Sequence, residues 1–484
     1  AVKFATAPRE LDDVAVDELE KLLSIPLDSL ALRVLELESY ADLVAFLPWD
    51  NRRQVAAVLL NAVLTNGNEL TDLTQIEELF CIITPLVRDD PGGDGMARDG
   101  SMAGGGSEGT GAGIGEAALV AKVVHLLRND DTDMAYEMLT LARRHLAEGG
   151  EGYIAHTLGP VAYCAFKLLD EVRRKEYVPK PPKDILPPVT VVGAKNAGDD
   201  LSDGLSDVTD DHTEGRGASS APFPAAFESS VGCRKLFVFL QETTVALSRS
   251  DPELGFTLYL QIACAADRCA RAASNSRKSE DGPEYTSIAY EIMAQAFLLY
   301  EAEVSDSKAQ QRAIVSMVGT LLSCRTFEKE DFEALVTKTA QYAAKLLKKT
   351  DQCKTVMICS HLFFTGEKND PKAYRNPQRV LECLQRSLKI ADACCMASPS
   401  NVQLFVDILD QYLYFYEREC PVIVDKFVSG LVALINEHMD NIGAADTTSV
   451  AVTEARKHFE QTVLYIKQKR NSSDTAERFA TIEV

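Results

Sequence analysis

The chain has 484 residues, a formal net charge of −22 at pH 7 and 46% hydrophobic residues. This excess of acid argues against nucleic-acid binding, because affinity for phosphate backbones comes mainly from lysine and arginine, and it weakens any general claim for binding anionic lipid. No apolar run approaches the roughly 18 residues of a membrane-spanning helix, and the first residues, AVKFATAPRELDD, lack the apolar core of a signal peptide.

Helical periodicity begins in the first part of the chain, residues 1–89. Between Asn51 and Leu64, four apolar residues fall on one face of a helix: Val55, Val58, Leu59 and Val63. A Gly-rich stretch follows over residues 90–114, with the strings GGDG, GGGSEG and GAG. Such a composition is typical of a flexible insertion.

Helical repeats are predicted again over residues 115–177, where a basic segment ends at Gly149-Gly150, as helix C-termini commonly do. Residues 178–230 open with PKPPKDILPP and continue through a long acidic, Ser-rich stretch. That composition cannot bury a core, so we expect a second insertion that is disordered.

The longest helical part covers residues 231–471 and is followed by a tail over 472–484. Asp251-Pro252-Glu253 places a capping side chain before proline and an acid in the first turn. Ser307 to Gln310 matches an S-x-x-Q capping box. Between Leu404 and Tyr416 the apolar residues cover more than one side of the helix, which is typical of a helix packed between two neighbours.

These patterns predict an all-α fold. About 17 helical segments of ~15–22 residues alternate with short connectors, and no strand pattern persists. We therefore predict an α-solenoid of HEAT-like helical pairs forming a curved rod, in which the two insertions interrupt one continuous stack. Strict sequence repeats are absent, so the prediction rests on the rhythm of the helices.

No pattern of a catalytic, phosphate-binding or metal site stands out. The sequence lacks a P-loop, H-E-x-x-H and G-x-S-x-G. Its 12 cysteines include no C-x-x-C, and we expect them to be reduced and buried in a cytosolic protein. His125 and His361 lie in apolar helical patterns and are expected to be core or interface residues. We predict no enzyme activity, no cofactor and no metal.

Two groups of charged residues are candidates for a protein contact. The acidic group lies at a predicted helix boundary: Glu301, Glu303 and Asp306. The basic group ends another predicted helix: Lys345, Lys348 and Lys349. Acid–base catalysis by the carboxylates is one interpretation, and helix capping with solvated side chains is a simpler one. A third is that the two groups, being opposite in sign, form a self-complementary contact between two copies.

Several long strings carry a family resemblance. They are AYEIMAQAFLLYEAEVSDSKAQ from Ala289, AAKLLKKTDQ from Ala343, HLFFTG from His361, RVLECLQRSLKIADAC from Arg379 and VQLFVDILDQYLYFYERE from Val402. Weaker strings are HLLRNDD from His125, ARRHLAEGG from Ala142 and HTLGP from His156. Together they resemble the largest subunit of the retromer complex, the vacuolar protein sorting 35 family, in family order. The likeness spans roughly Glu10 to Arg470 outside the insertions.

The resemblance implies a non-enzymatic α-solenoid scaffold that supports sorting of transmembrane cargo from endosomes to the Golgi or the plasma membrane. It implies a cytoplasmic protein, peripheral on the endosomal membrane. The chain would be the C-terminal half or more of that subunit, a fragment, as the missing initiator methionine also suggests. In the family this half holds a phosphoesterase-fold subunit in the concave face of the solenoid, and its far end pairs with a second copy. The acidic and basic groups match positions associated with that end.

Further partners implied by the resemblance are sorting nexins, actin-nucleation regulators and transmembrane cargo. The family motif P-R-L-Y-R-L, which serves the arrestin-like subunit, is not in this sequence, so that contact belongs to a region absent from this chain. Ala302 stands where the family has an acid, which weakens the acidic group. The alternatives are another α-solenoid adaptor of vesicle coats or nuclear transport and, third, an enzyme with a helical toroid.

Overall fold

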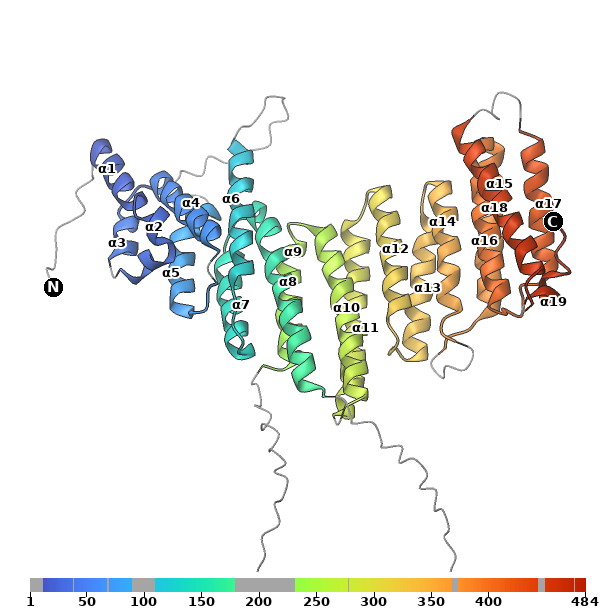
Figure 1. Cartoon of the computed structure of the whole chain (residues 1–484), viewed down its shortest axis with the longest axis horizontal. Coiled ribbons are helices and arrows are strands. Elements are labelled where there is room, and N and C mark those ends of the chain that lie inside the picture. The colour runs from blue at the N-terminus through green and yellow to red at the C-terminus, as the bar shows by residue number, and fades with distance from the viewer. Residues whose placement is uncertain are drawn as a thin grey trace, which may run out of the picture.

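The computed structural model describes residues 12–37, 39–67, 69–88, 109–178, 231–276, 278–367, 373–442, 449–473 and 475–484. In these residues the chain forms helices α1 to α19 and six short 3-10 turns (Figure 1). The only β pairings among them are two isolated bridges, Leu70 with Leu127 and Phe364 with Arg375. The predicted all-α fold is confirmed. None of the described helices has the length and apolar character needed to cross a membrane.

Eight helices precede the longest gap in the description: α1 (Asp13–Ser24), α2 (Leu27–Leu30), α3 (Tyr40–Ala45), α4 (Trp49–Asn66), α5 (Leu73–Ile83), α6 (Gly109–Val123), α7 (Thr132–Ala147) and α8 (Glu151–Glu176). The rest follow it: α9 (Cys233–Ser248), α10 (Pro252–Ser274), α11 (Gly282–Glu303), α12 (Ser307–Ser323), α13 (Lys329–Lys345), α14 (Lys349–Cys359), α15 (Pro377–Ala397), α16 (Gln403–Glu417), α17 (Asp425–Asp440), α18 (Val450–Arg470) and α19 (Ala476–Phe479).

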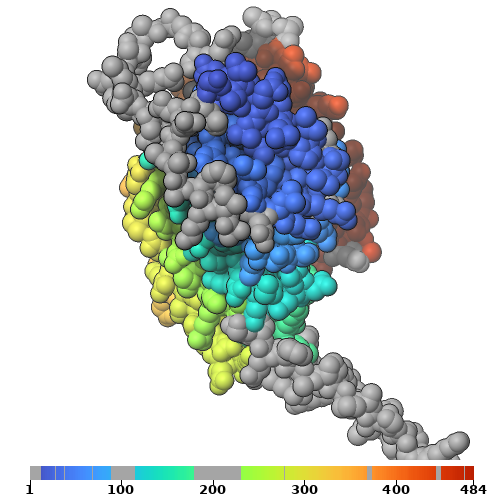
Figure 2. All heavy atoms as spheres, turned by 90° about the vertical axis from the view of Figure 1, so that its left-hand side faces the viewer, coloured from blue at the N-terminus to red at the C-terminus, as the bar shows by residue number. Residues whose placement is uncertain are grey.

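The helices stack in pairs. From α4 to α18, each even-numbered helix packs against the next even-numbered one, and each odd-numbered helix from α7 on packs against at least one even-numbered neighbour. Neighbours in sequence are therefore neighbours in space, which is the arrangement of a solenoid. Figure 1 shows the pairs side by side along the rod. Figure 2, seen from the N-terminal end, shows the middle of the chain displaced to one side of the two ends, so the rod is curved.

Helix α16 shows why the stack forms. Its five largest inward residues are at most 1% exposed: Phe405, Ile408, Leu409, Tyr412 and Phe415. They lie on more than one side of the helix because α14, α15, α17 and α18 all contact it. Burying each such side chain contributes about 1.5–3 kcal/mol. Helix α16 is therefore stable only when the helices on both of its sides are present.

The two ends of the gap over residues 179–230 lie close together. The Cys233 amide donates to Oε2 of Glu176 at 3.0 Å, and the Val231 amide donates to Oδ1 of Asp133 at 2.9 Å. Helices α8 and α9 on the two sides pack directly on each other. The stack therefore continues across this gap as one solenoid. The predicted insertions lie outside the described residues over 90–108 and 179–230.

Two predicted boundaries differ from the structure. Helix α6 begins at Gly109, inside the stretch predicted as a flexible insertion up to residue 114. Once Ala117, Val120 and Val123 are buried, each further turn toward the N-terminus adds hydrogen bonds at little cost, which explains the earlier start.

The predicted tail over 472–484 is also packed rather than free. Phe479 and Ile482 are at most 1% exposed, and the Phe479 ring meets the ring of Tyr416 edge-on at 5.5 Å. The Tyr416 hydroxyl donates to the Arg478 carbonyl at 2.5 Å. This segment closes the C-terminal end of the stack, because it covers apolar surface of α16 and α18.

We expect Phe479→Ala to destabilise the C-terminal repeat by about 3–5 kcal/mol, the usual cost of emptying a buried aromatic site. Hydrogen exchange of the α16 and α18 amides measures it. The control is Phe46→Ala, because Phe46 is 65% exposed and its removal leaves no cavity. Unchanged protection of α16 and α18 in the Phe479 variant would contradict the packing of this segment.

Candidate functional site: two surfaces at opposite ends of one helix

The acidic group lies where α11 ends and α12 begins. Asp306 is the N-cap of α12, and its Oδ2 accepts from the Ala309 amide at 2.8 Å. Gln310 donates from Nε2 back to the Val304 carbonyl at 3.0 Å. Of the predicted caps of this helix, Asp306 or Ser305 and, from the S-x-x-Q pattern, Ser307, the structure has Asp306, and Ser307 is the first helical residue. Because its carboxylate caps α12, Asp306 is less available than Glu303 for a contact with another protein.

Glu301 is already paired within the chain. Its Oε1 accepts from the Tyr342 hydroxyl at 2.8 Å and lies 2.8 Å from Nζ of Lys338. The hydrogen bond from Lys338, then that from Tyr342, and also the charge of Lys345 hold the pKa of the Glu301 carboxyl below its ordinary value. Glu301 therefore stays ionised at neutral pH and ties α11 to α13.

The three lysines lie at the connection from α13 to α14. Lys345 ends α13. Lys348 is the N-cap residue of α14, with Nζ 3.4 Å from Oδ2 of Asp351, and Lys349 donates from Nζ to Oε1 of Gln352 at 3.1 Å. All three are exposed. Because Lys338 and Tyr342 of α13 both contact Glu301, the end of α13 that carries Lys345 lies beside the end of α11 that carries Glu301.

Five helices, α15 to α19, follow the acidic and basic groups in the stack (Figure 1). Two exposed apolar residues lie on these segments or on the next helix: Leu347, 85% exposed, between the lysines, and Met396, 82% exposed, at the end of α15, which packs on α14. We call Glu301, Glu303, the three lysines, Leu347 and Met396 the charged edge. A surface with both charges side by side and exposed apolar residues has the composition of a two-fold contact.

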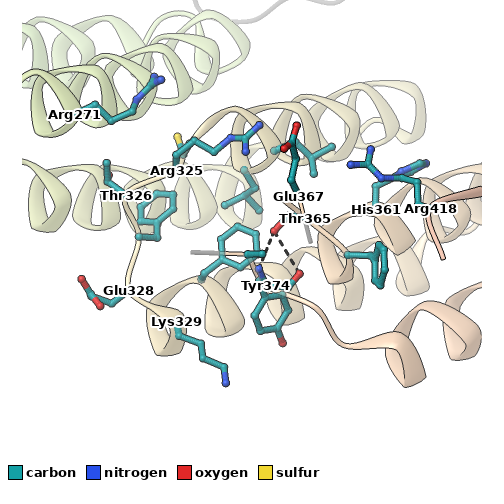
Figure 3. Close-up of a pocket in the computed structure, with 18 of the residues that line it drawn as sticks. Arg271, Arg325, Thr326, Glu328, Lys329, His361, Thr365, Glu367, Tyr374 and Arg418 are labelled. Atoms are coloured by element: carbon teal, nitrogen blue, oxygen red, sulfur yellow. Dashed lines mark hydrogen bonds between the residues drawn. The ribbon is translucent and has the colours of Figure 1, made fainter. Parts of the chain in front are cut away.

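A hollow of about 1010 Å³ lies at the other end of α12. Its walls come from the ends of α10, α12 and α16, the start of α13, and the segment around the 3-10 turn η5 (Ser360–Phe363). Figure 3 shows Arg325 and Arg418 on either side of Glu367, with Arg271 and Lys329 farther out. We call this the arginine hollow. Its cations outnumber its two acids, Glu328 and Glu367, in a chain that is acidic overall.

Asp267 holds one wall of the arginine hollow in place. This α10 residue is 1% exposed, and its Oδ1 accepts from the amides of Arg325 and Thr326, at 2.6 and 2.9 Å, and from the Thr326 hydroxyl, at 2.9 Å. Its Oδ2 lies 2.9 Å from Nε of Arg271. A buried carboxylate needs such partners. Sequence reasoning missed it; the available signal was a lone acid within the apolar string CAADRCARAA.

His361 lines the far side of the hollow. Its Nε2 is 2.5 Å from Oε1 of Gln411, and its ring lies 4.7 Å from that of Tyr414 and 5.2 Å from that of Phe415. Burial is the largest cause that lowers its pKa, so the ring is neutral at pH 7 and donates to Gln411. The prediction of an interface histidine agrees with this position. His125 is exposed in the 3-10 turn η3 (Val124–Leu126), so of the two predicted places, core or interface, the core is excluded for this residue.

In comparisons with known proteins, a family model and the matching relatives carry the same family name. A family model described as vacuolar protein sorting-associated protein 35 matches residues 2–438. The chain is 31% identical to vacuolar protein sorting-associated protein 35A of Arabidopsis thaliana, over 100% of this chain and 53% of that protein. It is 26% identical to vacuolar protein sorting-associated protein 35 of Dictyostelium discoideum, over 94% of this chain and 48% of that protein. The relative of that name in Schizosaccharomyces pombe is 37% identical over 39% of this chain and 23% of its own length. The chain spans about half the length of the relatives that it matches along most of its length.

We expect Asp267→Ala to loosen the wall of the arginine hollow. Three buried donors lose their acceptor, each loss costing about 1–3 kcal/mol, so a local destabilisation of about 3–5 kcal/mol is expected. Hydrogen exchange of the Arg325 and Thr326 amides should rise sharply, and less in Asp267→Asn, whose carbonyl oxygen still accepts. Asp392→Ala, at an exposed position, should leave these amides unchanged. Equal protection in Asp267→Ala and wild type would show that the carboxylate does not hold this connection.

Proposed function

Since the chain belongs to the vacuolar protein sorting-associated protein 35 family, we propose that it is a scaffold subunit of the retromer cargo-recognition complex. In this role it supports sorting of transmembrane cargo from endosomes to the Golgi or the plasma membrane. It acts without catalysis, in the cytoplasm and peripherally on the endosomal membrane. The observation that carries the proposal is the continuous helical stack with two exposed polar surfaces at opposite ends of α12.

The arginine hollow is the proposed centre of the contact with the phosphoesterase-fold subunit. It lies within residues 231–471, the part that the family resemblance assigns to this partner. Its walls are fixed by buried groups, Asp267 above all, so little conformational entropy is lost when a partner docks. A stable interface needs about 800 Å² on each side, so the hollow is the core of a larger contact. Its positive rim favours an acidic partner surface.

The charged edge is the proposed contact between two copies of the chain. A two-fold axis places the acidic group of one copy against the lysines of the other. Leu347 and Met396 supply apolar area near the charges, where interfaces gain most of their energy. Exposed ion pairs contribute about 0–1 kcal/mol each, so the pairing is weak in solution and gains from the many copies in a membrane coat.

The remaining partners follow from family membership alone. We propose sorting nexins, actin-nucleation regulators and transmembrane cargo as further partners, and contact with the arrestin-like subunit through a region absent from this chain. The alternative function, another α-solenoid adaptor of vesicle coats or nuclear transport, has no specific observation in its favour.

Reversing the charge of the arginine hollow should weaken the partner contact. We expect Arg325→Glu/Arg418→Glu to lower affinity for the phosphoesterase-fold subunit at least tenfold, because two cations that face an acidic surface become anions. Isothermal titration calorimetry with the purified partner measures it. Arg249→Glu/Arg312→Glu is the matched control, with the same change of charge at exposed sites outside the hollow, and should change affinity less than twofold. Equal affinity of both double variants would place the contact elsewhere.

Charge reversal at the charged edge should abolish self-association and a complementary swap should restore it. We expect wild type to dimerise weakly at low salt and less at physiological salt, where the Debye length is about 8 Å. Lys345→Glu/Lys348→Glu/Lys349→Glu and Glu301→Lys/Glu303→Lys should each be monomeric. An equimolar mixture of the two should form heterodimers. Sedimentation velocity reads all four samples. A triple variant that dimerises as well as wild type at low salt would remove the lysines from the contact.

A further inference from the structure

Helices α5 and α7, far along the stack from both surfaces described above, bring three different metal-ligating side chains together. The ligand atoms of Glu77, Cys81 and His145 all lie within 4.8 Å of one another. Glu77 and Cys81 are four residues apart and so share one face of α5. His145 comes from α7, which packs against α5. Among the described residues, no other group of three such side chains meets this criterion.

The Nε2 atom of His145 is an unsatisfied buried nitrogen. It is buried and has no hydrogen-bond partner, although Oε1 of Glu77 lies 3.3 Å away. The imidazole ring stacks on Phe80 with centroids 5.5 Å apart and planes 11° from parallel, which fixes its orientation toward Glu77. Buried polar atoms without partners are rare, and an ion is one established explanation.

The spacing suits a tetrahedral cation. Zinc binds histidine nitrogen at about 2.0–2.1 Å and carboxylate oxygen at about 2.0–2.2 Å. Two such ligands at a tetrahedral angle lie about 3.3–3.5 Å apart, which matches the separation between Nε2 of His145 and Oε1 of Glu77. One sulfur, one nitrogen and one oxygen donor form a set that favours zinc over magnesium or calcium, which prefer oxygen alone.

The surroundings leave room for entry and for a fourth ligand. Cys81 is the exposed cysteine among the 12 of the chain. A groove of about 540 Å³ opens at Glu77, which lines it together with Arg144. Arg144 donates to both oxygens of Glu77, at 2.8 and 2.7 Å. This contact orients the carboxylate, but its positive charge opposes a cation, so we expect a site of moderate affinity.

We propose that Glu77, Cys81 and His145 form a zinc-binding site that ties α5 to α7, with a water molecule as the fourth ligand. This departs from the expectation of no metal, which rested on the absence of closely spaced ligand pairs. The thiol of Cys81 releases its proton to solvent as the sulfur–zinc bond forms. Affinity therefore increases with pH, with about one proton released for each ion bound.

Calorimetric titration of the full chain with zinc, under reducing conditions and in competition with a chelator, tests the proposal. We expect one ion bound with moderate affinity, at least tenfold weaker binding in Cys81→Ala and in His145→Gln, and tighter binding in Arg144→Gln. Cobalt in place of zinc should give the thiolate-to-cobalt absorption band and the strong visible bands of a tetrahedral site, both lost in Cys81→Ala. Cys164→Ala is the matched control, because Cys164 also lies beside a histidine, with Sγ 3.5 Å from Nδ1 of His125.

The gain in Arg144→Gln separates a true site from damage to the fold, because misfolding does not tighten binding. Zinc should also raise the melting temperature of wild type and leave that of Cys81→Ala unchanged. Binding weaker than about 100 µM in wild type, or equal binding in wild type and Cys81→Ala, overturns the proposal. The second result would mean that Glu77 and His145 form only a charge pair and that Cys81 takes no part.

Discussion

Every even-numbered helix from α6 to α16 must bury opposite sides at once, one against the preceding even-numbered helix and one against the next. This two-sided burial is the constraint on which the rest of the structure depends. It explains why α10 carries small residues where α11 lies close, with Ala263, Ala266 and Ala270 at most 1% exposed, and why α16 carries large ones. A helix at the end of the stack has one apolar side with no further helix to cover it. At the C-terminus, Phe479 and Ile482 cover that side.

A stack of this kind leaves little surface for specificity along the buried helix faces. The connections and the ends of the helices carry it instead, because only there are polar groups free of the core. Helix α12 shows the consequence. Its first turn is capped by Asp306 beside the charged edge, and its last turn leads into Arg325 and the arginine hollow. A rigid helix therefore keeps the two surfaces at a fixed separation, which suits the two contacts proposed for them.

Both surfaces carry clustered positive side chains, although the chain as a whole is acidic. The chain repels acidic molecules at long range, since its net charge is −22. Arg325 and Arg418 at the hollow, and the three lysines at the edge, are local exceptions whose effect reaches about one Debye length. Recognition at either surface thus depends on close approach and on salt. The buried carboxylate of Asp267 belongs to the framework, because it fixes the connection that presents Arg325.

Sequence alone determined the all-α fold, because helical periodicity and capping residues are local and survive in any context, and it determined the family, because five long strings stand in family order. It also identified both charged groups. Tertiary structure decided where these groups lie. Residues 301 and 345 are 44 positions apart, and only the packing of α11 on α13 makes them neighbours. Asp267 accepts a hydrogen bond from an amide 58 residues away. His145 lies beside Glu77, which belongs to another helix. The exposure of His125 and the packing of residues 475–484 were open for the same reason. Burial depends on which helices meet, and no local pattern encodes that.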